Sequence, residues 1–389
     1  MPFDSARSLQ RETADGPDFA RAETAIEQFA ARHPYLLFRR GALPGIRRSA
    51  AVNPQLQARV TQVLAEIPPA AAQDPRTALK RQARRLINIA FLALTTKGSS
   101  ADAALAATRS ALAEYVAAAS WNERPVIRSF LDRGEIAVAV ALAYDWLYDR
   151  LATRERREIE RAILRNVLEP ADAAYTDPSL LWPKRRDNCT LVSNSAITIA
   201  ALAVLHRYPD LSARLVHRSL ASAWNVFAGL APDGAWREGL SYWSLAMRYA
   251  GLMVAALEST FGDSFGLADR PGFAQTGDLV LHAVGPFGAA FNFRGFRTSL
   301  RRVATHVARL SLWPANRWLA ARGAGWLASA LYNDLAETGK GLPGDPRSTY
   351  RQGVSQRRSR LFSQHLVPRT IGAAGLSGGL GRKYIRSDR

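Results

Sequence analysis

The sequence of 389 residues contains one cysteine, Cys189, so it can form no internal disulfide and no cysteine-based zinc cluster. Long apolar runs are also missing. The two longest, Ile136–Ala143 and roughly 191–205, are shorter than the about 18 to 20 residues that a membrane span needs. No apolar run typical of a secretory signal lies near the first residue. The sequence therefore predicts no membrane span and, as written, a cytoplasmic location.

Acidic residues are missing from one long stretch, since none lies between Asp278 and Asp334. The chain has 52 Lys+Arg against 33 Asp+Glu, a formal charge of +19, and residues 279–389 carry +14 of it. Such an excess favours a polyanionic partner: nucleic acid, anionic lipid or acidic polysaccharide. Residues 336–389 are rich in Gly, Ser and Arg and show no sustained period, so they are predicted to be a basic, irregular tail, disordered or aberrant.

From Phe19 to Phe261 apolar residues recur every three or four positions, which is typical of amphipathic helices, and no alternating run long enough for a sheet appears. Helices joined by short loops favour antiparallel hairpins. We therefore expect an all-α fold, an incomplete (α/α) toroid over residues 18–335, after a flexible N-terminus at 1–17. The predicted helices are Phe19–His33, Gln55–Ile67, Pro75–Thr95, Ala101–Ala119, Arg124–Leu151, Thr153–Leu168, Leu191–Arg207, Leu211–Leu230 and Glu238–Phe261.

Two loops combine polar and aromatic residues. Residues 181–190 read Leu-Trp-Pro-Lys-Arg-Arg-Asp-Asn-Cys-Thr, and residues 232–243 read Pro-Asp-Gly-Ala-Trp-Arg-Glu-Gly-Leu-Ser-Tyr-Trp. Each leads into a predicted helix, so both face the same rim if alternate helix starts do. In the second, Glu238 and Tyr242 are four residues apart and are expected to share a helix face.

These loops, together with three further motifs in the same order, make the sequence resemble the heparinase II/III-like polysaccharide lyases over about residues 30–293. The further motifs are His-Pro-Tyr-Leu-Leu-Phe at 33–38, Ala-Tyr-Asp-Trp-Leu-Tyr at 143–148 and Gly-Pro-Phe-Gly-Ala-Ala-Phe-Asn-Phe at 285–293. The resemblance implies an N-terminal α/α toroid, a following β-sandwich, and β-elimination on a uronate-containing, anionic polysaccharide. Members are often periplasmic or secreted.

β-Elimination removes the C5 proton beside a uronate carboxylate and expels the oxygen at C4. The site must therefore neutralise that carboxylate and supply a base and an acid. The resemblance implies that Asn188 is the neutralising amide, and that Tyr242 is the acid and, in some members, the base. Two structural alternatives stay open: Asn188 caps the helix that follows it, and Tyr242 lies in the core.

Basic residues in the first loop, Lys184, Arg185 and Arg186, are candidates for binding the acidic sugar. They could also favour a tyrosinate, whose formation at pH 7 costs about 4 kcal/mol from a reference pKa near 10. Glu238 is a further candidate for substrate binding. The alternatives are a solvated loop for the three cations, and for Glu238 a favourable charge at a helix N-terminus.

Three tryptophans of the same loops could offer flat apolar faces to sugar rings, or could simply pack in the interior. They are Trp182, Trp236 and Trp243. None of the six histidines stands at metal-ligand spacing from another histidine or a carboxylate, so we predict neither a zinc site nor any other cofactor. Cys189 stands where the family commonly has Trp.

The likeness ends after Phe293, where the family usually continues with an acidic residue and later a β-sandwich that contributes a catalytic histidine. This sequence instead continues with an acid-free tract. We expect a truncated C-terminal portion, read partly in a shifted frame, and a weakened lyase site.

Two other functions stay open: a noncatalytic carbohydrate-binding toroid, and a basic nucleic-acid-binding helical protein. The last depends on the tail, because residues 1–278 contain no basic recognition helix. The oligomeric state is not indicated.

Overall fold

The computed structural model describes residues 16–30, 32–52, 75–121 and 130–283, and these ranges are mostly helical with no β-strand among them. The prediction of an all-helical chain is confirmed for this part. Contacts divide the chain after Leu335, and every described residue lies in the first unit, Met1–Leu335. Most of the predicted flexible N-terminus, the predicted helix at 55–67 and the predicted basic tail lie outside the described residues.

The described ranges contain eleven α-helices, and one of the predicted helices continues further than expected. A π-helical turn, Leu164–Leu168, carries the chain past the predicted end at Leu168 into another helix. No helix of the described ranges is both long and apolar enough to cross a membrane. The α-helices are α2 (Phe19–Glu27), α3 (Leu43–Val52), α5 (Pro75–Thr95), α6 (Ser99–Ala117), α7 (Leu131–Leu147), α8 (Thr153–Ile163), α9 (Glu169–Thr176), α10 (Asn188–Ala203), α11 (Pro209–Phe227), α12 (Leu240–Phe261) and α13 (Asp278–His282).

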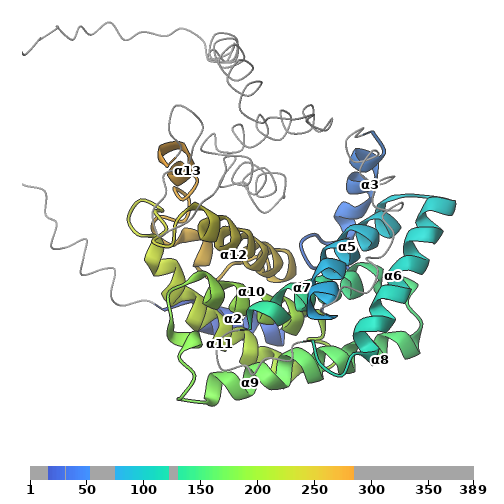
Figure 1. The fold of residues 1–389 in the computed structure, drawn as a ribbon, viewed down its shortest axis with the longest axis horizontal. Helices are drawn as coiled ribbons and strands as arrows, with labels where there is room; N and C mark the ends of the chain where they lie inside the picture. The colour runs from blue at the N-terminus through green and yellow to red at the C-terminus, as the bar shows by residue number, and fades with distance from the viewer. Residues whose placement is uncertain (1–15, 31, 53–74, 122–129, 284–389) are drawn as a thin grey trace, which may run out of the picture. The chain divides into compact units, whose positions relative to one another are not determined.

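The helices pack in an alternating order along the chain (Figure 1). Helix α5 packs against α7, α7 against α10, and α10 against α12, so these four helices form one row of spatial neighbours. The intervening helices form a second row: α6 packs on α5, α8 on α7, and α11 on α10, while α6 also contacts α8 and α9 contacts α11. The starts of α10 and α12 therefore lie on neighbouring helices of one row.

Helix α10 is the most buried helix of this part of the chain, and only Cys189 among its residues is partly exposed. Small side chains allow its neighbours to approach closely. A Cβ added to Gly134 of α7 would lie 3.2 Å from the Cβ of Ala196. The buried hydroxyls of Ser193 and Ser195 donate to the carbonyls of Cys189 and Leu191, at 2.7 Å each, so these two hydroxyls are satisfied within the helix.

The motif at residues 33–38 is anchored by one buried carboxylate on α7. Asp145 accepts hydrogen bonds from the backbone N–H groups of Tyr35 and Leu36, and its Oδ1 lies 2.7 Å from Nδ1 of His33. Burial raises the pKa of Asp145, while His33 and the two N–H groups act against that rise. His33 is 7% exposed, and its contact with Asp145 ties the start of the motif to α7.

Candidate functional site

The two loops singled out in the sequence meet through Asn188 and Glu238. Oε2 of Glu238 accepts a hydrogen bond from the backbone N–H of Asn188 at 2.7 Å, and Oε1 accepts one from its side-chain amide at 3.0 Å. Asn188 opens α10 and Glu238 stands just before α12, and these two helices pack together. The contact therefore joins the starts of two neighbouring helices.

The N-cap of α10 is Asp187 rather than Asn188. Oδ1 of Asp187 accepts hydrogen bonds from the backbone N–H and the hydroxyl of Thr190, each at 2.9 Å, and its Oδ2 pairs with Arg185 at 2.8 Å. The alternative in which Asn188 caps the helix is therefore wrong. Asp187 provides the cap, and the side-chain amide of Asn188 donates instead to Glu238 of the second loop.

The carboxylate of Glu238 complements the N-terminus of α10, and not that of the helix it precedes. Helix α12 begins at Leu240, and Gly239 before it has φ of 85°, a left-handed conformation that favours glycine. The expectation that Glu238 and Tyr242 share a helix face is therefore wrong, because Glu238 is outside the helix. A negative charge at a helix N-terminus contributes about 0.3 to 1 kcal/mol to stability.

Tyr242 lies in the first turn of α12 with 44% of its surface exposed. The alternative in which this phenol belongs to the core is therefore wrong. The side chain is accessible one turn of chain beyond the contact between Asn188 and Glu238.

Four basic side chains stand in the two loops that make this contact. Lys184, Arg185 and Arg186 are exposed, as expected for a loop that faces solvent. Arg237 is also exposed, and its guanidinium donates to the backbone carbonyl of Arg186. Sequence reasoning missed Arg237 as a site residue, although its position beside Glu238 in the second loop was a signal that could have found it.

Asn225 of α11 holds the backbone and one side chain of the basic loop. Its Nδ2 donates to the carbonyl of Lys184 at 3.2 Å, and its Oδ1 accepts from Nε of Arg186 at 2.7 Å. One turn earlier, Ser222 donates to the carbonyl of Pro183 and accepts from Nδ2 of Asn194 at 2.8 Å. The loop is therefore fixed to α10 and α11, while its cationic groups stay in water.

All three tryptophans proposed as sugar platforms are buried, so that expectation is wrong. Trp182 is 1% exposed and packs against Phe130 and Tyr175. Trp236 and Trp243 are 3% and 0% exposed. Large aromatic rings bury more apolar surface than most side chains, so these three tryptophans stabilise the interior and do not offer a face to a sugar.

The second loop is clamped by the segment between α12 and α13. Thr276 donates through its hydroxyl to the carbonyl of Gly234 at 2.7 Å, and the hydroxyl accepts from Nε1 of Trp243, also at 2.7 Å. Gly234 has φ of 82°, and an added Cβ would lie 2.3 Å from Cα of Thr276. This close approach fixes the path of the loop that presents Arg237 and Glu238.

The groups gathered here can bind an anion and move a proton. Guanidinium, ammonium and amide groups donate hydrogen bonds to carboxylates or sulfates, and the phenol of Tyr242 can give up a proton. Among the described residues, no three His, Cys, Asp or Glu side chains gather as ligands for a metal ion.

A scan against models of known protein families and a search of curated proteins each find no match to this sequence. The resemblance to the lyases therefore rests on the sequence motifs alone.

Proposed function

We propose that the chain binds a uronate-containing polysaccharide at the surface formed by residues 181–190 and 232–243, which we call the rim, and cleaves it by β-elimination. The observation that carries the proposal is the contact between Asn188 and Glu238, because it brings two separate motifs to one place. Four exposed cations stand in these loops, and a polyanion is the partner that such a charge pattern favours.

The proposed fold is an incomplete (α/α) toroid. The alternating packing of α5, α7, α10 and α12 in one row, with α6, α8 and α11 in another, supports it because a ring of helical hairpins requires this order. In such a fold the loops that precede the helices of the inner row lie at one rim. The starts of α10 and α12 are two of those positions.

In the proposed reaction, Asn188 uses its second amide hydrogen to bind the uronate carboxylate, while Glu238 fixes the orientation of the amide. A base removes the proton from C5, the C4–C5 double bond forms, and the bond between C4 and the glycosidic oxygen breaks. Tyr242 protonates that leaving oxygen. If the same tyrosine is the base, its phenolate takes the C5 proton and then passes it to the leaving oxygen.

The experiment is an ultraviolet absorbance assay for the unsaturated uronate product, run with alginate, heparan sulfate, hyaluronan and chondroitin. We expect one of them to give a rise that Tyr242→Phe reduces by about a hundredfold or more, the usual range for losing a general acid. Tyr242 is exposed, so this variant should retain its circular dichroism spectrum. A rise that is unchanged in Tyr242→Phe would contradict the assigned role.

A second candidate function is binding of the same glycan without cleavage. One observation favours it: the side-chain amide of Asn188 already donates to Glu238, which leaves only one hydrogen for a substrate. Saturable binding of a polysaccharide with no absorbance rise, weakened by Asn188→Ala, would support this alternative over the lyase.

A further inference from the structure

The three exposed cations of the first loop differ in how their side chains are held. Arg185 pairs through Nε with Oδ2 of Asp187 at 2.8 Å, so an acidic neighbour compensates its charge. Arg186 instead donates through Nε to Oδ1 of Asn225 at 2.7 Å, a neutral acceptor, and makes no ion pair with another described residue. The side chain of Lys184 makes no hydrogen bond within the described part of the chain. Arg186 is therefore both fixed and uncompensated, which the other two are not.

The backbone that presents these cations is held from below. Four carbonyls of the loop, at residues 182, 183, 184 and 186, each accept a hydrogen bond from a side chain of α10, α11 or the second loop. The donors are Thr190, Ser222, Asn225 and Arg237. Because protein donors engage these acceptors, the groups that the loop presents to water are mainly its cationic side chains.

The contact with Asn225 determines which edge of Arg186 is available. A guanidinium is planar, so a bond at Nε restricts its plane and leaves the two terminal amino groups to form paired hydrogen bonds with a carboxylate or a sulfate. Arg186 also stands two residues before the start of α10, where a partial positive charge favours an anion. The side chain is thus partly ordered before any ligand binds, which reduces the entropy lost on binding.

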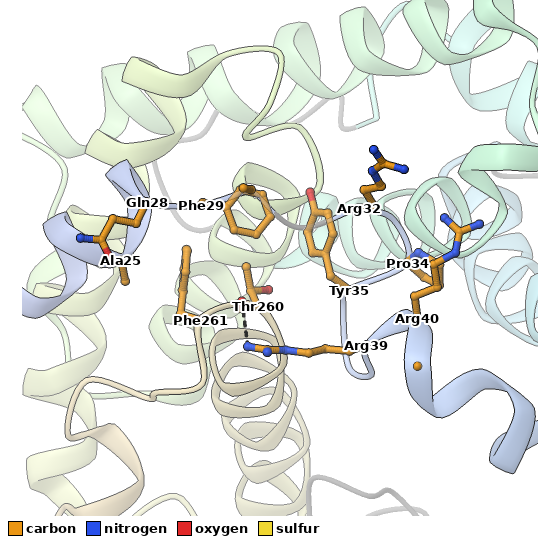
Figure 2. A pocket seen from close by; sticks show the side chains of 12 residues that line it. Ala25, Gln28, Phe29, Arg32, Pro34, Tyr35, Arg39, Arg40, Thr260 and Phe261 are labelled. Carbon is orange, nitrogen blue, oxygen red and sulfur yellow. Dashed lines mark hydrogen bonds between the residues drawn. The ribbon is translucent and has the colours of Figure 1, made fainter.

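Another group of arginines lines an open pocket of about 470 Å³ at the C-terminal end of α12 (Figure 2). Arg39 donates to carbonyls of the last turn of α12, where the partial negative charge of the helix end offsets its own, and Arg40 pairs with Asp149. In Figure 2 the side chain of Arg32 lies on the far side of Tyr35 from that of Arg39. The cations of this pocket are therefore compensated or stand apart, unlike the fixed arginine of the first loop.

We propose that Arg186 is the cation of the first loop that binds an acidic group of the polysaccharide directly, and that Asn225 of α11 is the residue that positions it. This inference rests on the proposed function, because it assumes that the rim binds a polyanion. It goes further by assigning unequal roles to three adjacent cations that the sequence does not distinguish.

The first test is isothermal titration of the full chain with alginate, heparan sulfate, hyaluronan and chondroitin, followed by titration of variants with the one that binds most tightly. Arg186→Gln and Arg185→Gln each remove one positive charge from adjacent positions, so both should weaken the long-range attraction to a similar extent, about twofold. Arg186→Gln also removes a direct contact, and its affinity should fall by about tenfold or more. Equal losses in the two variants would overturn the assignment of Arg186.

The second test isolates the positioning role of Asn225. Asn225→Ala changes no charge, and we expect its affinity to fall about fivefold, because the guanidinium of Arg186 must then be ordered during binding. In an Arg186→Gln background the same substitution should cause no further loss, since the side chain that Asn225 holds is gone. A structural effect through the carbonyl of Lys184 would persist in that background, and an undiminished loss there would contradict the positioning role.

The outcomes separate this inference from the proposed function. If the parent chain binds one of the polysaccharides and the predicted differences appear without an absorbance rise, the inference stands and the lyase assignment is wrong. If the rise appears while Arg186→Gln and Arg185→Gln bind equally, the lyase assignment stands and the inference is wrong. If the parent binds none of the four polysaccharides, both are wrong.

Discussion

The carboxylate of Glu238 accepts two hydrogen bonds from Asn188, one from the backbone and one from the side chain. Fifty positions separate the two residues in sequence, and the pairing ties the loop before α12 to the first turn of α10. It has consequences for stability as well as for the proposed chemistry, and the two can be measured separately.

Glu238→Gln should lower the free energy of unfolding by about 1 kcal/mol. The substitution removes the negative charge that stabilises the N-terminus of α10. It also replaces one accepting oxygen by an NH2 group, which then faces an N–H donor of Asn188. Urea unfolding followed by circular dichroism measures the change. Glu158→Gln is the control, since it removes a carboxylate from a surface pair with Arg154 and should cost less than about 0.5 kcal/mol. Equal losses in the two variants would show that the contact contributes nothing particular.

Arg237→Gln should weaken binding to the anionic polysaccharide that the chain prefers by about tenfold, because a charge-assisted hydrogen bond contributes about 1.5 kcal/mol or more. The affinity of the variant should also fall less steeply with added NaCl. Titration at several salt concentrations measures both effects. Arg154→Gln on α8, at an 88% exposed side chain outside the rim, should change neither. A similar loss in both arginine variants would indicate a general effect of net charge.

Gly234→Ala should cost about 2 kcal/mol or more. The added Cβ meets the backbone of Thr276 at 2.3 Å, and alanine is strained at φ of 82°. Thermal and urea unfolding report the loss, and binding at the rim should weaken with it because the loop is displaced. Gly229→Ala places its Cβ where no atom lies within 4 Å, so its stability should match the parent within about 0.5 kcal/mol. A tolerated Gly234→Ala would mean that the loop can take another path.

Tyr35→Phe should change the alkaline stability of the chain. Burial, with the charge of Asp145 adding to it, raises the pKa of Tyr35 well above its ordinary value of 10. The unfolded chain then releases this proton at a lower pH than the folded one, so the contribution of Tyr35 is complete below pH 10 and is lost as pH rises towards its folded pKa.

At pH 7 the variant should be less stable by about 1 kcal/mol, because the phenol donates to the carbonyl of Leu202 at 2.9 Å. Above about pH 10 the difference from the parent should shrink, since only the parent has this group to ionise. Unfolding curves at successive pH values test this. A difference that stays constant up to pH 11 would contradict the assignment of the raised pKa.

Helical periodicity gave the class of the fold and several boundaries. The helix at Pro75–Thr95 was predicted with both ends correct, because a proline opens it and polar residues follow it. The start of α10 was placed three residues late, since the capping role of Asp187 was not recognised in a basic run. Helix α3 was missed altogether, because its residues include Pro44, Gly45 and two arginines that weaken the apolar pattern.

The site residues stay a prediction, and only their local placement can be compared with the structure. Because each loop leads into a helix, the two were expected to face the same rim, and Asn188 and Glu238 of these loops are in contact. Side-chain exposure could not be inferred in the same way. A tryptophan in a polar loop is compatible with either a sugar platform or a buried packing role, and the tertiary structure decides between them: Trp182, Trp236 and Trp243 are all buried. The left-handed turn at Gly239, which separates Glu238 from α12, also depends on tertiary structure that a local spacing rule ignores.

The tight approach of Gly134 to Ala196 limits how this chain can diverge. A Cβ at position 134 would lie 3.2 Å from the Cβ of Ala196, so this neighbour would have to give way by a few tenths of an ångström, and larger side chains at either position would need more room. Homologous chains should therefore keep both positions small, or enlarge one only where the other has shrunk. This paired constraint acts on the packing of α7 against α10 and is separate from the loop motifs.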